Sequence, residues 1–350
     1  MRFHNHVISL MDEGTYGEKI RELGVPITSI GMKSGVPTLL SCNKLLKTVK
    51  EAVPDIIQGW MYHGNFAAYF AQRYAASKSH LLWNIRHSLY DLSYEKGTTR
   101  FVIKTNRFFS AKPIRILYNS RISRRQHEDF GFSSKRGMVI PNGIDVEKFV
   151  PCPEKARLVR TQLAIPDNAF VIGHVARFHP MKDHHLFLRS AAKLAKKYNN
   201  IYFLLCGRNV VPENMKLLSA IPQSLCQRFI FLGERHDIPE LFCAMDCFSS
   251  SSYGEGFPNV VGEAMASGIP CVVTNVGDSA YIVGDAGIVV PPRDSLALAA
   301  GLEKIFLMTD DERKQLQKKA RARIVERFSL SAIVKQYIDI YESIFQGQLG

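Results

Sequence analysis

Two glutamates, a glycine-rich loop and a short helix are combined in residues 254–268, GEGFPNVVGEAMASG. The pattern predicts a loop that turns at its leading glycines and enters a helix stopped by Gly268. The first helical turn has N–H groups without intrahelical partners, and the positive end of the helix dipole lies there, so it can bind phosphate. Glu255 and Glu263 bracket this position and could stand on the order of 10 Å apart. That arrangement suits a ligand with hydroxyls at both ends and a diphosphate between them, as in a nucleotide sugar.

Two cations stand in the loop that follows an expected buried strand at residues 170–176. Arg177 and Lys182 are five residues apart, and Pro180 bends the chain between them. A departing nucleoside diphosphate gains negative charge, which a fixed Arg and Lys would stabilise. The alternative is two ordinary surface cations beside a helix start, but a helix N-terminus disfavours extra positive charge.

These motifs, E-x7-E and R-x4-K, resemble those of family 4 of the retaining glycosyltransferases with the GT-B fold, and the resemblance covers nearly the whole chain. It implies that Glu255 meets the sugar hydroxyls, that Glu263 meets the ribose, and that Arg177 and Lys182 clamp the diphosphate. It also implies further donor-binding residues around the helix start and at two strand ends: Gly256, Phe257, Pro258, Asn259, Val260, Gly207 and Arg235.

A histidine at a strand end is a further candidate for the catalytic site. His87 ends an expected strand at residues 81–85, and the family places a His at the corresponding position, near the transferred sugar. His63, which we place at the end of another strand, competes for the same role, and a lone His is often structural. Two turns, Asn119-Ser120 and residues 142–145, match family landmarks that shape the cleft rather than catalyse.

Alternation of strand-like and helix-like segments predicts an α/β fold with parallel sheets. The family resemblance implies GT-B architecture: two doubly wound, Rossmann-like domains facing a central cleft. We expect an N-terminal acceptor-side domain at 1–165, a linker within 148–167, a nucleotide-sugar-binding domain at 166–328, and a C-terminal helix, 329–350, crossing back onto the first domain. Expected strands lie at 6–10, 26–30, 55–60, 81–85, 114–118, 138–140, 170–176, 201–206, 229–232, 247–250, 271–274 and 288–290, and expected helices at 16–23, 38–53, 65–76, 183–197, 238–244, 295–306, 310–327 and 329–345.

Charge is unevenly distributed. Residues 1–150 hold 22 Lys and Arg against 12 Asp and Glu, a net charge of +10, whereas residues 151–350 hold 23 against 20, a net charge of +3. A basic half can attract an anionic membrane surface or an anionic substrate, or can simply be solvated. No nucleic-acid-binding motif is present, and no apolar run approaches the ~18 residues of a membrane span. We see no signal peptide, and we expect a cytoplasmic protein, peripheral at the inner face of the membrane if the basic half binds lipid.

No cofactor or metal is expected. There is no D-x-D motif, and Asp310-Asp311 fits the charged first turn of a helix. The absence of a G-x-G-x-x-G after a strand argues against a dinucleotide oxidoreductase. Seven cysteines without C-x2-C spacing favour buried reduced thiols.

We therefore predict a retaining, metal-independent transferase that moves a hexose-type sugar from a nucleoside diphosphate, UDP by expectation, to a hydroxyl acceptor. The family's bacterial members suggest an acceptor on a lipid-linked sugar or polysaccharide of the cell envelope. Two alternatives stay open: a catalytically silent nucleotide-sugar-binding protein, and a GT-B epimerase or phosphorylase. A phosphorylase would need a lysine for pyridoxal phosphate, for which no motif is present.

The beginning of the chain departs from the family pattern. Family members start with an apolar strand and a Gly-Gly loop, whereas His6 to Leu10 here matches the second strand and no Gly-Gly follows. Such a first strand is normally central, so its neighbours should lack a partner between them. We therefore expect an N-terminally shortened chain with a less stable first domain, impaired acceptor transfer and intact UDP binding.

Overall fold

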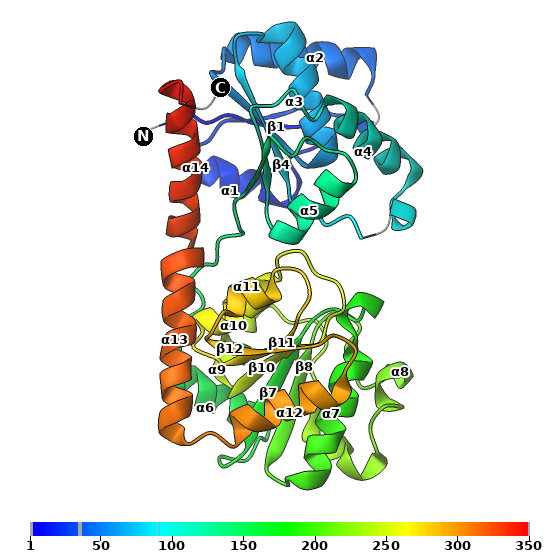
Figure 1. The fold of residues 1–350 in the computed structure, drawn as a ribbon, viewed down its shortest axis with the longest axis vertical. Helices are drawn as coiled ribbons and strands as arrows, with labels where there is room; N and C mark the ends of the chain where they lie inside the picture. Colours follow the sequence, from blue (N-terminus) through cyan, green and yellow to red (C-terminus); the bar gives the residue numbers. More distant parts are fainter. Residues whose placement is uncertain (1–2, 34–36, 91, 349–350) are drawn as a thin grey trace. The chain divides into compact units, whose positions relative to one another are not determined.

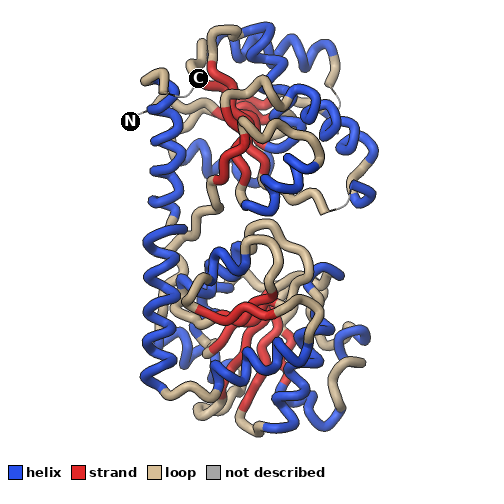
Figure 2. The backbone as a smooth tube through the Cα atoms, viewed as in Figure 1, coloured by secondary structure: helices blue, strands red, loops and turns tan. Residues whose placement is uncertain are grey.

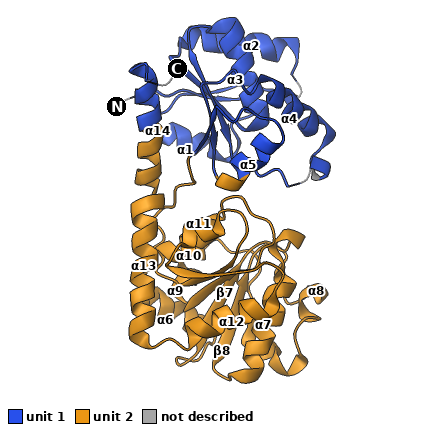
Figure 3. Cartoon of the chain, viewed as in Figure 1, with its two compact units in different colours: residues 1–119, 123–139, 339–350 blue, residues 120–122, 140–338 orange. Residues whose placement is uncertain are grey.

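The protein is described here from a computed structural model, in which residues 3–33, 37–90 and 92–348 are described. Its contacts divide into two units (Figure 3): unit 1 comprises Met1–Asn119, Ser123–Val139 and Asp339–Gly350, and unit 2 comprises Ser120–Ile122 and Ile140–Ile338. The division at Val139 comes earlier than the boundary expected at residue 165. Residues 1–2 and 349–350, which the expected domains include, lie outside the described part.

Unit 1 contains two separate parallel sheets. Strands β1 and β2 form one, and four strands in the order β3-β4-β5-β6 form the other. Among the described residues, no strand joins β1 to β3, which agrees with the break expected from the sequence. The strands of unit 1 are β1 (Val7–Ser9), β2 (Ile27–Ser29), β3 (Ile56–Trp60), β4 (His80–Ile85), β5 (Arg115–Tyr118) and β6 (Gly137–Val139).

Helices flank these strands (Figures 1 and 2), and local sequence explains several of their ends. Thr38 caps the start of α2 in a reciprocal bond with Ser41, and Val53 ends that helix in a left-handed conformation. The helical elements are η1 (Gly14–Tyr16), α1 (Gly17–Glu22), α2 (Leu39–Ala52), α3 (Met61–Ala75), η3 (Leu92–Tyr94), α4 (Gly97–Phe109) and α5 (Arg121–Asp129), which begins in unit 2.

Three expectations for unit 1 need correction. The apolar spacing in the expected helix at 38–53 places Leu39 and Leu40 on one face with Leu45 and Val49, but both leucines are exposed, because they lie in the first turn before the helix packs against its neighbours. Helix α3 begins at Met61, directly after β3, and not at residue 65. Helices α4 and α5 were not expected, because their sequences are rich in polar residues and carry only narrow apolar stripes.

Unit 2 has one continuous parallel sheet of six strands in the order β12-β11-β10-β7-β8-β9. Its central strands β7 and β8 are buried except for one half-buried residue each, and they are rich in Val, Ile, Leu and Phe, as expected for a sheet covered on both faces. The strands are β7 (Phe170–Val175), β8 (Ile201–Cys206), β9 (Phe229–Phe231), β10 (Cys247–Ser250), β11 (Cys271–Thr274) and β12 (Gly287–Val290).

The stretch 148–167, expected to be a linker, contains helix α6, whose first residue is Pro153 and which packs against α9. Proline is well tolerated at the first helical position, so the prolines that suggested a linker instead mark a helix start. The other helical elements of unit 2 are η4 (Pro180–Lys182), α7 (His184–Lys197), α8 (Met215–Leu218), η5 (Gln223–Arg228), α9 (Ile238–Cys243), α10 (Asn259–Ala266), α11 (Ser279–Val283), α12 (Ser295–Phe306), α13 (Asp310–Phe328) and α14 (Leu330–Phe345).

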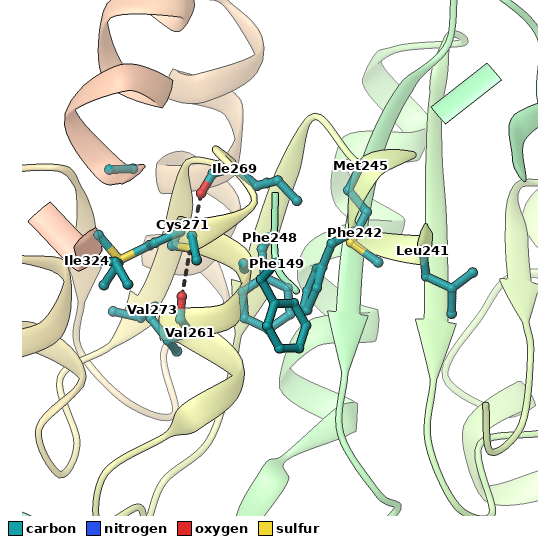
Figure 4. Packing of buried hydrophobic residues seen from close by; sticks show 14 of the residues in the cluster. Phe149, Leu241, Phe242, Met245, Phe248, Val261, Ile269, Cys271, Val273 and Ile324 are labelled. Atoms are coloured by element: carbon teal, nitrogen blue, oxygen red, sulfur yellow. Dashed lines mark hydrogen bonds between the residues drawn. The ribbon is translucent and has the colours of Figure 1, made fainter. Parts of the chain in front are cut away.

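The core of unit 2 is built around its sheet. One face holds a large cluster in which Phe242 and Phe248 contact edge to face (Figure 4), and the other holds a second cluster beneath α7 and α12. Cys271 is fully buried, and its thiol donates to the carbonyl of Ile269 at 3.4 Å. Cys206 and Cys247 are buried as well, but Cys42, Cys152, Cys226 and Cys243 are only partly buried, which corrects the expectation of buried thiols at these four positions.

Helix α14 begins in unit 2, and its residues from Asp339 onward cluster with unit 1. There the hydroxyl of Tyr341 donates to Gln58 on β3 at 2.8 Å. Within the described part of the chain, none of the helices has the length and apolar character needed to cross a membrane.

Candidate functional site

The strand order of unit 2 reverses at its centre. From β7 the chain proceeds outward through β8 to β9, and from β10 it proceeds in the opposite direction through β11 to β12. In such sheets ligands bind outside the carboxyl ends of the strands at the point of reversal, here between β7 and β10. Lys182 lies in the loop after β7 and Glu255 in the loop after β10, so the topology places both residues at this point.

Lys182 and Glu255 form the centre of the site. The Lys182 Nζ is 2.5 Å from Glu255 Oε1, and the same oxygen accepts a bond of 2.6 Å from the Ser252 hydroxyl. Both charged side chains are largely shielded from solvent, with 23% and 11% of their surface exposed. A shielded, hydrogen-bonded cation of this kind is poised to meet an anion. The sequence had indicated both charged residues but neither their pairing nor Ser252.

Hydrogen bonds tie the two loops together. The Ser251 hydroxyl lies 2.9 Å from the carbonyl of Lys182 and 3.0 Å from that of Asp183, and the Tyr253 N–H donates to the Met181 carbonyl at 2.9 Å. From β11, the Thr274 hydroxyl donates to the Ser252 carbonyl at 2.6 Å. These bonds fix the backbone that carries Lys182 and Glu255. They were missed because Ser and Thr give no motif signal on their own.

Helix α10 begins beside this pair, as the sequence predicted. Its N-cap is Pro258, and no side chain caps its first amides. Asn259 is exposed, and its Oδ1 accepts a bond of 2.6 Å from the Asn142 side chain. Phe257 is 7% exposed and packs with Phe328, so only its backbone can serve a ligand. The helix start therefore presents first-turn N–H groups without a side-chain cap where a phosphate is expected.

Glu263 lies one turn into α10, and burial raises the pKa of its carboxyl, an effect that Lys148 partly opposes. A carboxyl with a raised pKa is suited to hydrogen bonds with neutral hydroxyls. The fold thus separates a half-buried carboxyl at Glu263 from an ion-paired one at Glu255, although the two belong to one motif. The difference in environment could not be read from their spacing.

Gly277 supports the loop of Glu255 from behind. It has a positive φ of +55°, and a Cβ at this position would come within 2.4 Å of the Glu255 carbonyl and 2.6 Å of the Gly256 carbonyl. The next residue, Asp278, donates its N–H to the Gly256 carbonyl at 2.9 Å. Only glycine fits this close approach. No motif pointed to Gly277, because a single glycine between expected strands is an ordinary turn signal.

The other predicted donor-binding positions lie around the same sheet edge. Gly207 follows β8 with a φ of +151°, and a Cβ there would meet the Ala176 carbonyl at 2.1 Å, so this glycine lets two loops approach closely. Arg235 follows β9, and its guanidinium is held by Asp237, with Nε–Oδ1 at 2.8 Å. Arg177 follows β7 and is exposed. Val260 and Gly256 are half-buried beside the helix start.

In unit 1, His87 follows β4 and belongs to a chain of polar side chains. Its Nε2 lies 3.4 Å from a Glu95 carboxylate oxygen, and its Nδ1 lies 3.4 Å from the Tyr62 hydroxyl, which in turn is 2.8 Å from Nε2 of buried His127. Burial lowers the pKa of His127 to about 4, so this ring is neutral at pH 7. The His87 side chain is 41% exposed. It is oriented by neighbours and still accessible.

His63 differs from His87 in its setting. It lies in the first turn of α3, not at the end of a strand as the sequence suggested, because helix α3 begins directly after β3. It is exposed and lines a cavity beside β3. The structure therefore surrounds His87 with orienting partners and leaves His63 at a cavity mouth.

In the described portion of the chain, no cluster of His, Cys, Asp and Glu side chains is arranged to hold a metal ion. Asp310 and Asp311 form the first turn of α13, capped by Thr309 in a reciprocal bond with Glu312. The interpretation of this pair as a helix start is confirmed.

Comparison with known proteins gives two family matches. A family model described as Glycosyltransferase Family 4 matches residues 1–148, and a model for glycosyl transferases group 1 matches residues 169–307. Among curated relatives, a UDP-Gal:alpha-D-GlcNAc-diphosphoundecaprenol alpha-1,3-galactosyltransferase of Escherichia coli is 27% identical over 93% of this chain and 84% of its own length. A D-inositol 3-phosphate glycosyltransferase of Corynebacterium urealyticum is 30% identical over 62% of this chain, which spans only 53% of that relative.

Solved structures share the fold. Anabaena HepE, in complexes with UDP and with UDP-glucose, matches with TM-scores of 0.81 and 0.77 at 24% identity, covering 97% of this chain and 92% and 91% of HepE. The two-domain parallel α/β architecture expected from the sequence is thus confirmed.

Proposed function

The chain belongs to the family 4 glycosyltransferases of the GT-B fold, and we propose that it transfers a hexose-type sugar from a UDP-sugar to a hydroxyl acceptor with retention of the anomeric configuration. The observation that carries this proposal is the Lys182–Glu255–Ser252 cluster at the point of strand reversal, beside the uncapped start of α10. HepE, of the same fold, has been solved with UDP and with UDP-glucose.

The donor would lie across these residues in an extended fashion. Its diphosphate would be bound by the Lys182 ammonium, the Arg177 guanidinium and the first amides of α10. Its sugar hydroxyls would replace part of the contact between Glu255 and Lys182, and the ribose hydroxyls would meet Glu263. Gly207 and the region of Arg235 would border the base. Because Lys182 is already held at 2.5 Å from Glu255, little reorganisation is needed to present its charge.

The proposed chemical step exchanges one bond at the anomeric carbon. The bond from this carbon to the phosphate oxygen breaks, and the electron pair stays with UDP. The bond to the acceptor oxygen forms on the same face, and the acceptor proton passes to the leaving phosphate oxygen. Lys182, Arg177 and the helix amides stabilise the charge that develops on UDP. His87, oriented by Glu95 and Tyr62, is proposed as a further residue that contacts the transferred sugar.

We propose a lipid-linked sugar as acceptor, with peripheral membrane contact through unit 1. The Escherichia coli relative acts, by its name, on a diphosphoundecaprenol-linked sugar. Helix α4 combines exposed Phe101 and Phe108 with the cations Arg100, Lys104 and Arg107, a pattern suited to the surface of an anionic bilayer. Vesicles of phosphatidylglycerol should therefore retain the protein in a sedimentation assay. A Phe101→Ser/Phe108→Ser variant should lose this retention, while donor binding to unit 2 is unchanged.

The proposed activity is tested by incubating the protein with UDP-hexoses and a polyprenyl diphosphate-linked N-acetylglucosamine. The expected result is release of UDP with formation of an α-linked product, whose configuration NMR coupling constants report. Addition of EDTA should leave the rate unchanged, because cationic side chains of the protein, and not a metal ion, neutralise the diphosphate. Inversion of configuration would contradict the retaining step. A complete loss with EDTA that Mg²⁺ or Mn²⁺ restores would contradict metal independence.

A second candidate, a nucleotide-sugar-binding protein without transfer, is favoured by one observation: the sheet of unit 1 is split between β1 and β3. In that case UDP-sugar binding, measured by calorimetry, would occur without turnover on any acceptor. Slow release of UDP without acceptor would instead identify a transferase.

A further inference from the structure

The loop that carries Arg177 and Lys182 is closed at its base by a histidine. The loop leaves β7 after Val175 and ends at α7, whose first residue is His184. The His184 Nε2 lies 3.2 Å from the carbonyl oxygen of Ala176, which is at the other end of the same loop. Because a carbonyl oxygen only accepts hydrogen bonds, this ring nitrogen carries a proton and donates it. One side-chain hydrogen bond therefore joins the two ends of the loop.

A second histidine spans the point where the pairing of β7 with β10 stops. The ladder between these strands ends with Gly173 opposite Phe248, although both strands continue beyond it. Past the end of the ladder, the His174 Nδ1 donates to the Ser249 carbonyl of β10 at 2.9 Å. The strand order reverses between β7 and β10, so a side-chain bond replaces main-chain pairing at the edge where the proposed donor site lies.

The two histidines also contact each other. Their ring centroids are 4.8 Å apart, and the rings are nearly perpendicular, at 86°. His174 stacks on Phe187 at 4.7 Å, and His184 meets Phe178, a residue of the loop, at 5.4 Å. His174 is 2% exposed and His184 is 1% exposed. The pair therefore forms a buried, packed connection from the loop after β7 to β10.

Both rings are neutral at pH 7. Burial lowers the pKa of His184 to about 4 and holds the pKa of His174 well below its ordinary value, and the charge of Lys182 acts in the same direction on both. Each neutral ring has one N–H, and the carbonyl groups determine which nitrogen carries it: Nε2 in His184 and Nδ1 in His174. An apolar side chain of similar size could fill the space but could not donate to either carbonyl.

We propose that His174 and His184 are positioning residues for the donor, which hold the loop of Arg177 and Lys182 in place against β10 so that both cations meet the diphosphate without rearrangement. Ala176, whose carbonyl His184 holds, directly precedes Arg177. Since the peptide unit is planar, fixing this carbonyl also fixes the N–H and Cα of Arg177. The proposal rests on the proposed function, and it adds two residues that do not themselves contact the donor.

NMR of the imidazole nitrogens tests the pair in the full chain without a ligand. Two-bond ¹H–¹⁵N spectra distinguish the two neutral tautomers and the charged ring, and the signals are assigned by their loss in His174→Asn and His184→Gln. At pH 7 we expect His174 as the Nδ1–H tautomer and His184 as the Nε2–H tautomer. A charged ring, or the opposite tautomer in either residue, would overturn the proposal.

Calorimetric titration with UDP tests the positioning role. His184→Leu removes the donor and keeps an apolar side chain, whereas His184→Gln keeps an amide N–H near the position of Nε2. UDP should bind at least about tenfold more weakly to His184→Leu than to wild type, and within about threefold of wild type to His184→Gln. At position 174 the same comparison uses His174→Leu and His174→Asn, because the Asn amide lies near the position of Nδ1.

Leu188→Ala is the matched control for a general loss of stability. Leu188 is fully buried on α7, so this variant should lower Tm but should bind UDP within about threefold of wild type. Unchanged UDP affinity in a folded His184→Leu protein, or equal losses in His184→Leu and Leu188→Ala, would overturn the proposal and leave the donor site standing. If His184→Leu does not fold, the tautomers and the comparison at His174 decide. A wild-type chain that binds no UDP would refute the proposed donor, and this inference with it.

Discussion

Unit 1 and unit 2 are both built from parallel strands and covering helices, but only unit 2 has a continuous sheet. In unit 2 six strands surround a point of reversal, and the loops after β7 and β10 are held by hydrogen bonds to one another. In unit 1 the described strands form two separate sheets, β1-β2 and β3-β4-β5-β6. The comparison teaches that the proposed donor site draws all its residues in unit 2 from one continuous sheet and its loops, and does not depend on the divided strands of unit 1.

Replacing Lys182 should cause the largest effect. Lys182→Ala removes the shielded cation that is paired with Glu255, so we expect turnover to fall by about 10²–10³, as for the loss of one charge-stabilising donor. Steady-state kinetics with a UDP-sugar measures this change. Lys193→Ala, an exposed lysine on α7 of the same unit, is the matched control and should behave as wild type. Turnover of the Lys182→Ala enzyme within threefold of wild type would show that Lys182 does not bind the diphosphate in the reaction.

The next prediction concerns the stability of unit 1 and its buried histidine, His127. The folded-state pKa of His127 is lowered to about 4 by burial, so the unfolded chain binds more protons between pH 6.5 and 4. The contribution of neutral His127 to stability is present above about pH 6.5 and is lost as the pH falls toward 4. At pH 5 the free energy of unfolding should be lower than at pH 7 by about 2 kcal/mol from this group.

Urea unfolding of wild type and His127→Gln at pH 7 and pH 5 measures this contribution. The variant should show a smaller decrease in stability between the two pH values. Exposed His4→Gln serves as the control and should follow wild type. An identical pH dependence in wild type and His127→Gln would show that this histidine is not buried in the neutral form.

A smaller effect is expected at Gly277. Gly277→Ala places a Cβ against the carbonyls of Glu255 and Gly256 at a positive φ, so it should cost at least about 1 kcal/mol in folding and weaken binding of the sugar part of the donor. Gly24→Ala in unit 1 is a matched control, because Gly24 has a φ of +71° but open space around it. Thermal unfolding and donor titration separate the two effects. Equal losses of donor affinity in both variants would show that the contact behind the Glu255 loop is unimportant.

Much of this comparison could be anticipated from the sequence. Helix α10 and the strands β7, β8 and β10 follow from apolar runs and glycines that act locally, whereas the break before β3 was expected from the departure from the family pattern. Reliance on local sequence signals also explains which elements were predicted wrongly. The prolines around α6 look identical in a linker and at a helix start. Polar α4 and α5 become helices through packing that the sequence shows only weakly.

The internal construction of the site could not be predicted for the same reason. Ser252, Thr274 and Gly277 act on residues that the fold brings to them, and each is an ordinary residue in its own segment. The pairing of Lys182 with Glu255 joins loops 73 positions apart. It depends on β7 and β10 being neighbours, and this is a property of strand order rather than of motif spacing.

The central claim is that unit 2 binds a UDP-sugar with Glu263 on the ribose and Glu255 on the sugar. Isothermal calorimetry with free UDP and with UDP-glucose, on wild type, Glu255→Ala and Glu263→Ala, tests it directly. Glu263→Ala should weaken both ligands to a similar degree, because both carry the ribose. Glu255→Ala should keep the affinity for UDP and lose affinity for UDP-glucose. Loss of UDP affinity in Glu255→Ala with retention in Glu263→Ala would contradict the assignment.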